Sequence, residues 1–391
     1  TPPELVITMS HRPPVFILLL TALAVSVLYA PQPILPILAT DFTVSETDSA
    51  LLITLCMLPL GLAPLFYGYI LEGLSAKLLL IGATLILAAC QLAMALTSDW
   101  YLLITFRTLQ GLAIPALLTA LMTTMTSACK HEHVRHAAAW YVAATIVGGF
   151  TGRALTGLVT EAFNWNIAIG MWGIMLLIVL PGIYRLPYNP AAGFHKVRFS
   201  IFTEVLGIDG IRHAYIAIFC IFFVFAAMLN VLPFQLLHRN PDIGVGVIGM
   251  IYTGYIAGFI TALNTTRIHT LLGSESHTLF LGIFAFSAGL IVFLPQDIAS
   301  NFIAMFIFCG GMFLVHTSLS GQVNHLSEGH KGVVNGSYIA SYYLGGSAGS
   351  WLATLIFSHY GWTVFIIVLA AFIGVAAWHI AQLHQKALKP S

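Results

Sequence analysis

The chain of 391 residues is 59% hydrophobic and only 7% charged, with a mean hydropathy of +0.92. Soluble domains carry about 25% charged residues, so this composition excludes a soluble protein and indicates an integral membrane protein. The formal net charge of +1, with lysines and arginines spread along the chain, gives no indication of a nucleic-acid partner.

Twelve apolar stretches in the chain are long enough to cross a bilayer as helices, because about 20 residues span its hydrocarbon core. They lie near 15–38, 49–71, 78–97, 101–127, 134–160, 166–184, 214–237, 244–264, 277–294, 299–321, 333–357 and 362–383. The alternating polarity of barrel strands is missing from them, so all are expected to be helices. The sequence therefore predicts an all-α membrane protein with twelve transmembrane helices in two six-helix bundles.

One long connection, from Arg185 to about His213, separates six of these spans from the other six. We expect an N-terminal bundle over 1–190, a cytoplasmic linker over 191–213 and a C-terminal bundle over 214–391. The other loops are short, so we expect no soluble domain with enzymatic chemistry, no catalytic residue and no cofactor. The histidine cluster His131–His136 is interpreted as a solvated turn, not a metal site, because its spacing suits a metal poorly.

Basic residues are distributed unequally between the two sides of the predicted membrane. Twelve of the fifteen lysines and arginines fall on the side of the N-terminus, Arg239 falls on the other side, and Arg107 and Arg153 lie inside spans. By the positive-inside rule, both termini of this multi-pass protein are cytoplasmic. All aspartates and glutamates fall outside the spans, so the sequence offers the two buried arginines no carboxylate at their own depth.

A glycine-rich stretch around Arg153 recurs 197 positions later, in the eleventh span. The matching pairs are Tyr141 with Tyr338, Gly149 with Gly346, Gly152 with Gly349 and Trp165 with Trp362. Glycines at such spacing let neighbouring transmembrane helices approach closely. Arg153 has Ser350 as its counterpart and Arg107 has Ile307, so both membrane arginines belong to the first half alone.

Three motifs, on a 6+6 arrangement of spans, resemble those of the major facilitator superfamily. The loop after the second span keeps Gly68, Glu72 and Lys77 of the family's Gly-x-Leu-x-Asp-Arg-x-Gly-Arg-Lys pattern, without its arginines. The fourth span carries the Arg-x-x-Gln-Gly pattern from Arg107. The fifth span is similar to the glycine-rich motif of the drug:proton antiporter branch, with Arg153 in place of its proline, as in sugar-efflux-like permeases.

The resemblance implies two bundles that rock about a central cavity and expose it to each side of the membrane in turn. Spans 1, 4, 7 and 10 would line it, and the residues nominated for substrate binding are Tyr29, Gln32, Arg107, Gln110, Asn230, Gln235 and His316. Arg153 joins this set because a charge at bilayer depth is costly. Gly68, Glu72 and Lys77 would form a cytoplasmic gate, closed against Arg135 or the start of span 11.

The nominated side chains also have structural interpretations. Arg153 could hydrogen-bond loose carbonyls of its glycine-rich helix, and Arg107 could hold helices together instead of meeting substrate. His316 could be a neutral packing residue, or its protonation could change with access, because histidine titrates near neutrality. Tyr29 and Gln32 stand beside prolines that release backbone carbonyls, which favours a place in a cavity.

We expect a secondary active transporter that moves a small organic solute across the bacterial inner membrane, by proton-coupled efflux as the resemblance implies. Two buried arginines without a buried carboxylate favour an alternative, the uptake or export of an anion such as a carboxylate siderophore or an organic acid. An alternative of another class is a non-transporting membrane sensor. The expected partners are the solute, protons and membrane lipids, and the chain is expected to act as a monomer.

Overall fold

The computed structural model describes residues 15–127, 134–186, 191, 199–208, 210–295, 297–326 and 331–387, and these residues are almost entirely helical. The first half contains α1 (Val15–Tyr29), η1 (Gln32–Ile34), α2 (Leu35–Asp41), α3 (Glu46–Ile70), α4 (Ala76–Leu96), α5 (Trp100–Ser127), α6 (Val134–Ala162) and α7 (Trp165–Tyr184). After α8 (Phe199–Gly207), the second half contains α9 (Ile211–Arg239), α10 (Val245–Ile251), η3 (Tyr252–Gly254), α11 (Tyr255–Leu272), α12 (Glu275–Val292), α13 (Ile298–His325) and α14 (Lys331–Ala387).

The described residues contain the twelve predicted membrane-length segments. Eleven helices are long and apolar enough to cross a membrane, and α14 accounts for two of the predicted spans. Its continuity is broken at Gly361, whose φ of 75° lies in the left-handed region that favours glycine. The chain turns back there, so the predicted all-α fold with twelve spans is confirmed.

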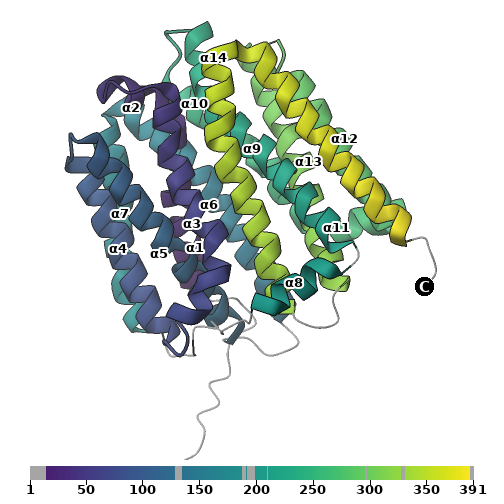
Figure 1. Cartoon of the computed structure of the whole chain (residues 1–391). Coiled ribbons are helices and arrows are strands. Elements are labelled where there is room, and N and C mark those ends of the chain that lie inside the picture. The colour runs from purple at the N-terminus through teal and green to yellow at the C-terminus, as the bar shows by residue number, and fades with distance from the viewer. Residues whose placement is uncertain are drawn as a thin grey trace, which may run out of the picture.

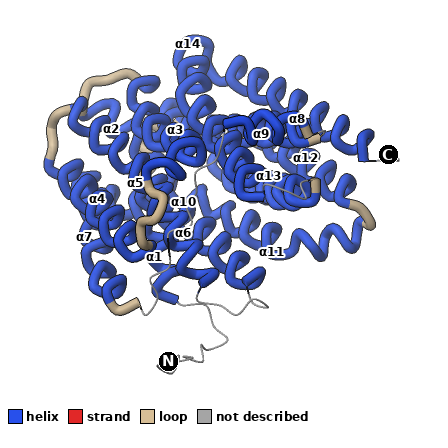
Figure 2. The backbone as a smooth tube through the Cα atoms, turned by 60° about the horizontal axis from the view of Figure 1, so that its bottom comes forward, coloured by secondary structure: helices blue, strands red, loops and turns tan. Residues whose placement is uncertain are grey.

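The helices of the two halves form two groups that lie side by side, coloured purple to blue and green to yellow in Figure 1. An even number of spans returns the chain to the side on which it began, and Figure 1 shows α8 and the C-terminal end of α14 toward the same end of the molecule. Figure 2 shows that short loops join most helices.

The linker predicted over 191–213 contains a helix, α8, that the sequence analysis did not anticipate. Its apolar side chains include Val205, which is buried, and α8 contacts α9 and α14. Nine residues were too few to show a helical period among the surrounding prolines and basic residues. The exact boundaries of the linker and of the two bundles stay predictions.

The first and eighth spans are interrupted near their middles. Pro31 has no backbone N–H, so the carbonyl of Val27, four residues earlier, loses its usual helical partner, and η1 follows. In the eighth span, η3 separates α10 from α11, and Gly254 packs there on the backbone of Met305 in α13. The interruptions matter because η1 carries Gln32, and Tyr252 and Tyr255 flank the second break.

Glycines of α6 and α14 pack in the same way on the first helix of their own half. A Cβ on any of these glycines would lie within 3 Å of backbone atoms of the partner helix. The four pairs are Gly148 on Ala22, Gly152 on Ser26, Gly345 on Phe219 and Gly349 on Phe223. Glycine and partner both shift by 197 positions between the halves, so the sequence repeat is also a repeat of helix packing.

Gly152→Ala should destabilise the fold, because the new Cβ would lie 2.5 Å from the carbonyl oxygen of Ser26. Overpacking of this kind costs about 1–3 kcal/mol. The apparent melting temperature of the purified protein in detergent measures the effect. Gly82→Ala in α4 is the matched control, since a Cβ there meets nothing within 4 Å. Equal melting temperatures for the two variants would contradict the packing argument.

Candidate functional site

Arg153 occupies the centre of the molecule, near the middle of α6, with only 1% of its surface exposed. Its Nε donates a hydrogen bond to Oε1 of Gln32 at 2.5 Å, and its Nη1 donates to the carbonyl of Gly149 at 2.5 Å. Among the described residues, no aspartate or glutamate forms an ion pair with it. The cation is therefore compensated by neutral groups alone within the described part of the chain.

Three tyrosine rings surround the guanidinium of Arg153. Its Cζ lies 4.0 Å from the ring centroid of Tyr29, 4.8 Å from that of Tyr255 and 5.1 Å from that of Tyr252. Cation–π contacts of this kind are attractive, and they gain strength when the cation is removed from water. Tyr29 belongs to the first half and the other two rings to the second, so the cage closes only when the halves meet at this point.

Gln32 connects Arg153 to the second half through a second hydrogen bond. Its Nε2 donates to Oδ1 of Asn230 in α9, and both side chains are fully buried. Nδ2 of Asn230 has no hydrogen-bond partner among the described residues. Nη2 of Arg153 also donates to no acceptor among them. Arg153 and Asn230 thus each keep a donor without an acceptor among the described residues, and that of Asn230 is buried.

Local backbone features position this cage. A Cβ on Gly149 would lie 3.1 Å from Cε1 of Tyr255, so a glycine lets the ring approach α6. The hydroxyl of Tyr252 donates to the carbonyl of Leu229 in α9 at 2.7 Å, which fixes this ring from behind. The break at η3 brings both tyrosines to the same side of the span.

Arg107 forms a separate network inside the first half. Its guanidinium donates to the carbonyls of Leu52 and Leu28, both at 2.7 Å, and Val27, at 3.1 Å, and to Oε1 of Gln110 at 2.7 Å. Nε2 of Gln110 donates in turn to Gln91 at 2.9 Å. Four of the five N–H groups of Arg107 are therefore bonded to protein. A contact of Arg107 or Gln110 with substrate stays a prediction.

The sequence around Arg107 explains its role at the end of α1. Pro31 deprives the carbonyl of Val27 of its helical partner, and the arginine of α5 donates to that oxygen instead. Gly111, one turn along α5, would place a Cβ 2.6 Å from the carbonyl oxygen of Cys56, so glycine lets α5 lie against α3. The Arg-x-x-Gln-Gly pattern thus joins α1, α3 and α5.

Two other nominated residues lie apart from Arg153. Gln235 lines a cavity at the end of the molecule opposite α8. His316 of α13 lies with its Nδ1 3.0 Å from the hydroxyl of Tyr338, and its ring is 4.8 Å from that of Tyr342. His316 therefore packs against two tyrosines of α14. Its role in binding stays a prediction.

The predicted cytoplasmic gate residues lie at the end of the molecule that carries α8. Nζ of Lys77 donates to the carbonyls of Tyr184 and Leu186 at 2.7 and 3.2 Å, so it bonds within its own half. Glu72 is exposed in the loop after α3, and Gly68 lies within α3 itself. The side chains of Arg135 and of the rest of the cluster His131–His136 are not among those that the structure describes. The gate stays a prediction.

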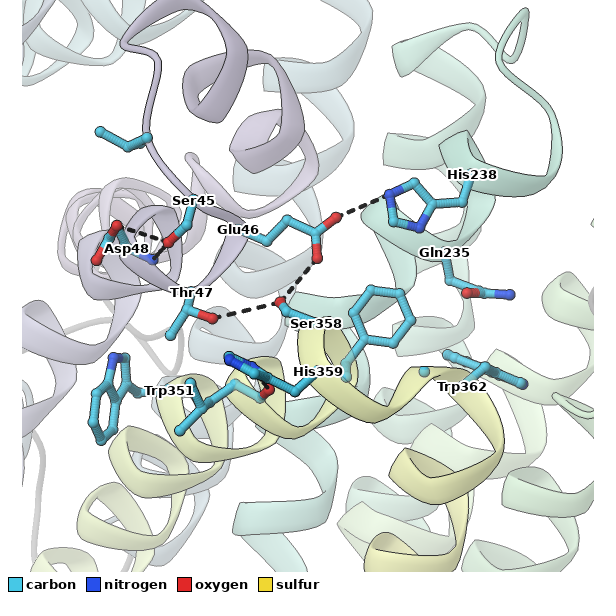
Figure 3. A pocket seen from close by; sticks show the side chains of 14 residues that line it. Ser45, Glu46, Thr47, Asp48, Gln235, His238, Trp351, Ser358, His359 and Trp362 are labelled. Carbon is cyan, nitrogen blue, oxygen red and sulfur yellow. Dashed lines mark hydrogen bonds and ion pairs between the residues drawn. The ribbon is translucent and has the colours of Figure 1, made fainter.

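A cavity of about 870 Å³ lies between the two halves at the opposite end (Figure 3). We call it the outer mouth, after the orientation that the sequence predicts. The start of α3, the end of α9 and the middle of α14 line it. Glu46 of α3 crosses from the first half, forming an ion pair with His238 at 2.9 Å and accepting a hydrogen bond from Ser358 at 3.0 Å (Figure 3). A second link joins Glu161 of α6 to the backbone N–H of Gly246 in α10.

Sequence reasoning missed four residues that the structure brings together across the halves: Tyr252, Tyr255, Glu46 and His238. It considered only spans 1, 4, 7 and 10 together with Arg153, and the two tyrosines belong to span 8. Their spacing beside a glycine in an apolar span was the available signal. Glu46 and His238 lie at helix ends, where charged residues are ordinary, so their pairing left no signal in the sequence.

The arrangement around Arg153 is suited to holding an anion and not to catalysis. Within the described residues, no group of histidine, cysteine, aspartate or glutamate is placed to hold a metal ion. The buried cation, the unpartnered amide of Asn230 and the hydroxyls of Tyr29 and Tyr255, which have no hydrogen bond to the described residues, are all donors. A bound carboxylate would accept hydrogen bonds from these groups.

A family model described as the Major Facilitator Superfamily matches residues 17–349. The inner membrane transport protein YnfM of Escherichia coli (strain K12) is 24% identical over 373 residues, which cover 92% of this chain and 88% of that protein. The uncharacterized MFS-type transporter YybF of Bacillus subtilis (strain 168) is 23% identical over 373 residues, which cover 93% of this chain and 91% of that protein.

Solved structures share the same fold. A crystal structure of the nucleoside transporter NupG, in a mutant form, has a TM-score of 0.78 at 12% identity and covers 95% of this chain and 98% of its own. A bacterial homolog of the human lysosomal transporter Spinster, in an inward-facing and unoccupied conformation, has a TM-score of 0.77 at 11% identity, covering 95% and 96%.

Arg107→Gln should lower the stability of the fold more than Arg153→Gln does. The first change removes donors to four acceptors, and the second removes donors to two. Each buried acceptor left unsatisfied costs about 1–3 kcal/mol. Folded yield and apparent melting temperature in detergent compare the two variants. A larger loss in Arg153→Gln would reverse the assignment of structural roles.

Proposed function

Because the chain belongs to the major facilitator superfamily, we propose that it carries a small organic anion across the membrane by alternating access, with the anionic group bound at Arg153. The family and the relatives are membrane transporters and not enzymes, so transport itself follows from membership. The anionic substrate, its site, the direction of transport and the proton coupling form the proposal.

The observation that carries the proposal is a fully buried guanidinium without a carboxylate partner among the described residues. A buried charge is strongly penalised unless an opposite charge or a full set of hydrogen bonds compensates it. Arg153 has two hydrogen bonds to neutral oxygens and three ring contacts. A substrate carboxylate would accept two hydrogen bonds from the planar fork of an arginine, which is the strongest neutralisation available there.

Neutral groups around Arg153 would complete the binding of an anion. The unpartnered Nδ2 of Asn230 and the hydroxyls of Tyr29 and Tyr255 are donors that the described residues leave unused. A carboxylate has more lone pairs than a guanidinium fork uses, so these donors would bind its remaining positions. The apolar body of the substrate would then lie against the tyrosine rings.

The distribution of these groups between the halves suits alternating access. Arg153, Gln32 and Tyr29 belong to the first half, whereas Asn230 and Tyr255 belong to the second. A substrate held at Arg153 would therefore contact both halves, and the Gln32–Asn230 hydrogen bond would break when the halves separate. Binding sites at the interface of repeats, beside interrupted helices, are typical of secondary transporters.

Proton-coupled efflux is the direction that we propose, in line with the similarity of α6 to the motif of the drug:proton antiporter branch. Arg153 stands where that motif has proline, and this supports the alternative, in which an anion such as a carboxylate siderophore or an organic acid is taken up or exported. A location in the bacterial inner membrane with cytoplasmic termini is part of the same proposal. The name of YnfM, an inner membrane transport protein, supports the location.

Arg153→Gln should lower the apparent affinity for an anionic substrate at least about tenfold, because charge-assisted hydrogen bonds contribute about 1.5–3 kcal/mol. Arg153→Lys should recover part of this loss, since lysine keeps the charge but loses the two-donor fork. A thermal-shift screen of organic acids against matched amides identifies the ligand, and titration of the variants measures affinity.

Ser350→Ala is the matched control for these variants. Ser350 is the repeat counterpart of Arg153, is fully buried, and its hydroxyl has no partner among the described residues. Its removal should leave affinity unchanged. If Arg153→Gln folds normally and binds the identified acid as well as the Ser350→Ala variant does, the anion proposal fails.

Transport in proteoliposomes should respond to a proton gradient. With the identified substrate inside and a more acidic medium outside, efflux through a proton antiporter should exceed efflux at equal pH, and a protonophore should abolish the difference. Protein-free liposomes show the passive leak of the protonated acid, which must be subtracted. Equal protein-dependent rates with and without the gradient would contradict proton coupling.

A further inference from the structure

The outer mouth is joined across the halves by Glu46. One of its carboxylate oxygens pairs with Nε2 of His238 at 2.9 Å, and the other accepts a hydrogen bond from Ser358 at 3.0 Å. Figure 3 shows the carboxylate between these two partners. The side chain of His238 is 56% exposed and that of Glu46 is 22% exposed, so a proton from the aqueous side reaches the imidazole directly.

Both side chains of this pair lie at helix ends. Glu46 lies in the first turn of α3, where the helix dipole stabilises an anion. His238 lies in the last turn of α9, where the dipole stabilises a cation. A protonated His238 therefore binds Glu46 by charge, by a hydrogen bond and with support from both helix ends.

The two halves differ in the side chain at the position of His238 and in the partner that it contacts. In the first half, Asp41 at the end of α2 accepts a hydrogen bond from Nε1 of Trp165 at 2.6 Å, within the same half. Adding 197 positions to each leads to His238 and Trp362. His238 contacts Glu46 of the other half instead, and Nε1 of Trp362 is buried without a hydrogen-bond partner among the described residues.

The rings of His238 and Trp362 both pair with the ring of Phe357. The ring centroid of Phe357 is 5.8 Å from that of His238 and 6.4 Å from that of Trp362, and all three line the outer mouth. A neutral imidazole has one nitrogen that accepts a hydrogen bond, whereas a protonated imidazole has only donors. A protonated His238 can therefore donate a hydrogen bond to Glu46. A neutral His238 can instead accept a hydrogen bond from Trp362, as Asp41 does from Trp165.

We propose that His238 is a proton-binding site that opens and closes the outer mouth. With a proton bound, it pairs with Glu46 and holds the two halves together. Without the proton, it turns to accept the hydrogen bond of Trp362 within its own half, and the mouth opens. A more acidic exterior thus favours the closed mouth. The inference goes beyond the anion proposal, and its test needs no substrate, so either can fail alone.

Other titratable and charged groups surround this site, and most are engaged elsewhere. Asp48 of α3 accepts a hydrogen bond from Ser45, and Nδ1 of His359 in α14 lies 3.0 Å from the carbonyl of Leu355 in its own helix. Asp41 of α2 binds Trp165. Arg239 and Asp242 follow His238 in the chain. His359 is the histidine that serves as a control.

Distance measurements between spin labels at the outer ends of the halves test the proposal. Ser98→Cys in the α4–α5 loop and Ala299→Cys at the start of α13 place exposed labels on the two halves, and the protein without these changes reports the background from its native cysteines. Raising the pH from about 5.5 to about 8 should increase the population with long distances. We expect about a two- to five-fold increase, the effect of a partly exposed ion pair.

Four variants in the labelled protein separate the proposed roles. His238→Gln should abolish the pH response, and His238→Arg, which stays charged, should keep the mouth closed at both pH values. Trp362→Phe, which removes the indole N–H, should reduce the open population at high pH toward its low-pH level. His359→Gln should respond like the unchanged protein.

The proposal is overturned if the unchanged protein shows no pH response, or if His238→Gln retains the full response. It is also overturned if His359→Gln loses the response, because another histidine then senses the proton. A Trp362→Phe variant with the full open population at high pH overturns the exchange of partners.

Discussion

Much of the structure around α6 depends on one buried positive charge, Arg153, with which no aspartate or glutamate of the described residues pairs. Arg153 needs groups that can face a cation where water is excluded, and the structure supplies amide and carbonyl oxygens together with three aromatic rings. These groups come from α1, η1, η3 and α11 as well as α6. Two interrupted spans and a close glycine contact are required to bring them within reach.

The two halves share a packing frame but not their polar chemistry. Glycines of α6 and α14 contact their partner helices at positions that differ by one constant offset. The polar groups at equivalent positions differ: Arg153 stands against Ser350, and Asp41 against His238. In the functions proposed above, the shared frame would let the halves rotate against each other with similar surfaces. The side chains that differ between the halves would determine what is bound at Arg153 and what closes the mouth.

The helices and the repeat could be predicted from sequence because both depend on local patterns, namely apolar length and glycine spacing. The difference between Arg107 and Arg153 could not, because in sequence each is one arginine inside an apolar span. The surroundings of each arginine determine the difference. The end of α1 offers Arg107 carbonyls as hydrogen-bond acceptors, whereas Arg153 contacts the tyrosines of span 8. The contact between the fifth and the eighth span is a property of the tertiary fold. Patterns along one sequence do not show it.

The tyrosine cage also bears on the step in which an unloaded carrier returns. A transporter that binds its cargo with a buried cation must pass through one stage of its cycle in which that cation has no cargo bound. Burial of the uncompensated charge would make this stage costly. If the proposed anion site is correct, the rings of Tyr29, Tyr252 and Tyr255 would stabilise the guanidinium of Arg153 while cargo is absent. Cargo would have to displace part of this contact, which would moderate its net affinity and make its release on the far side easier.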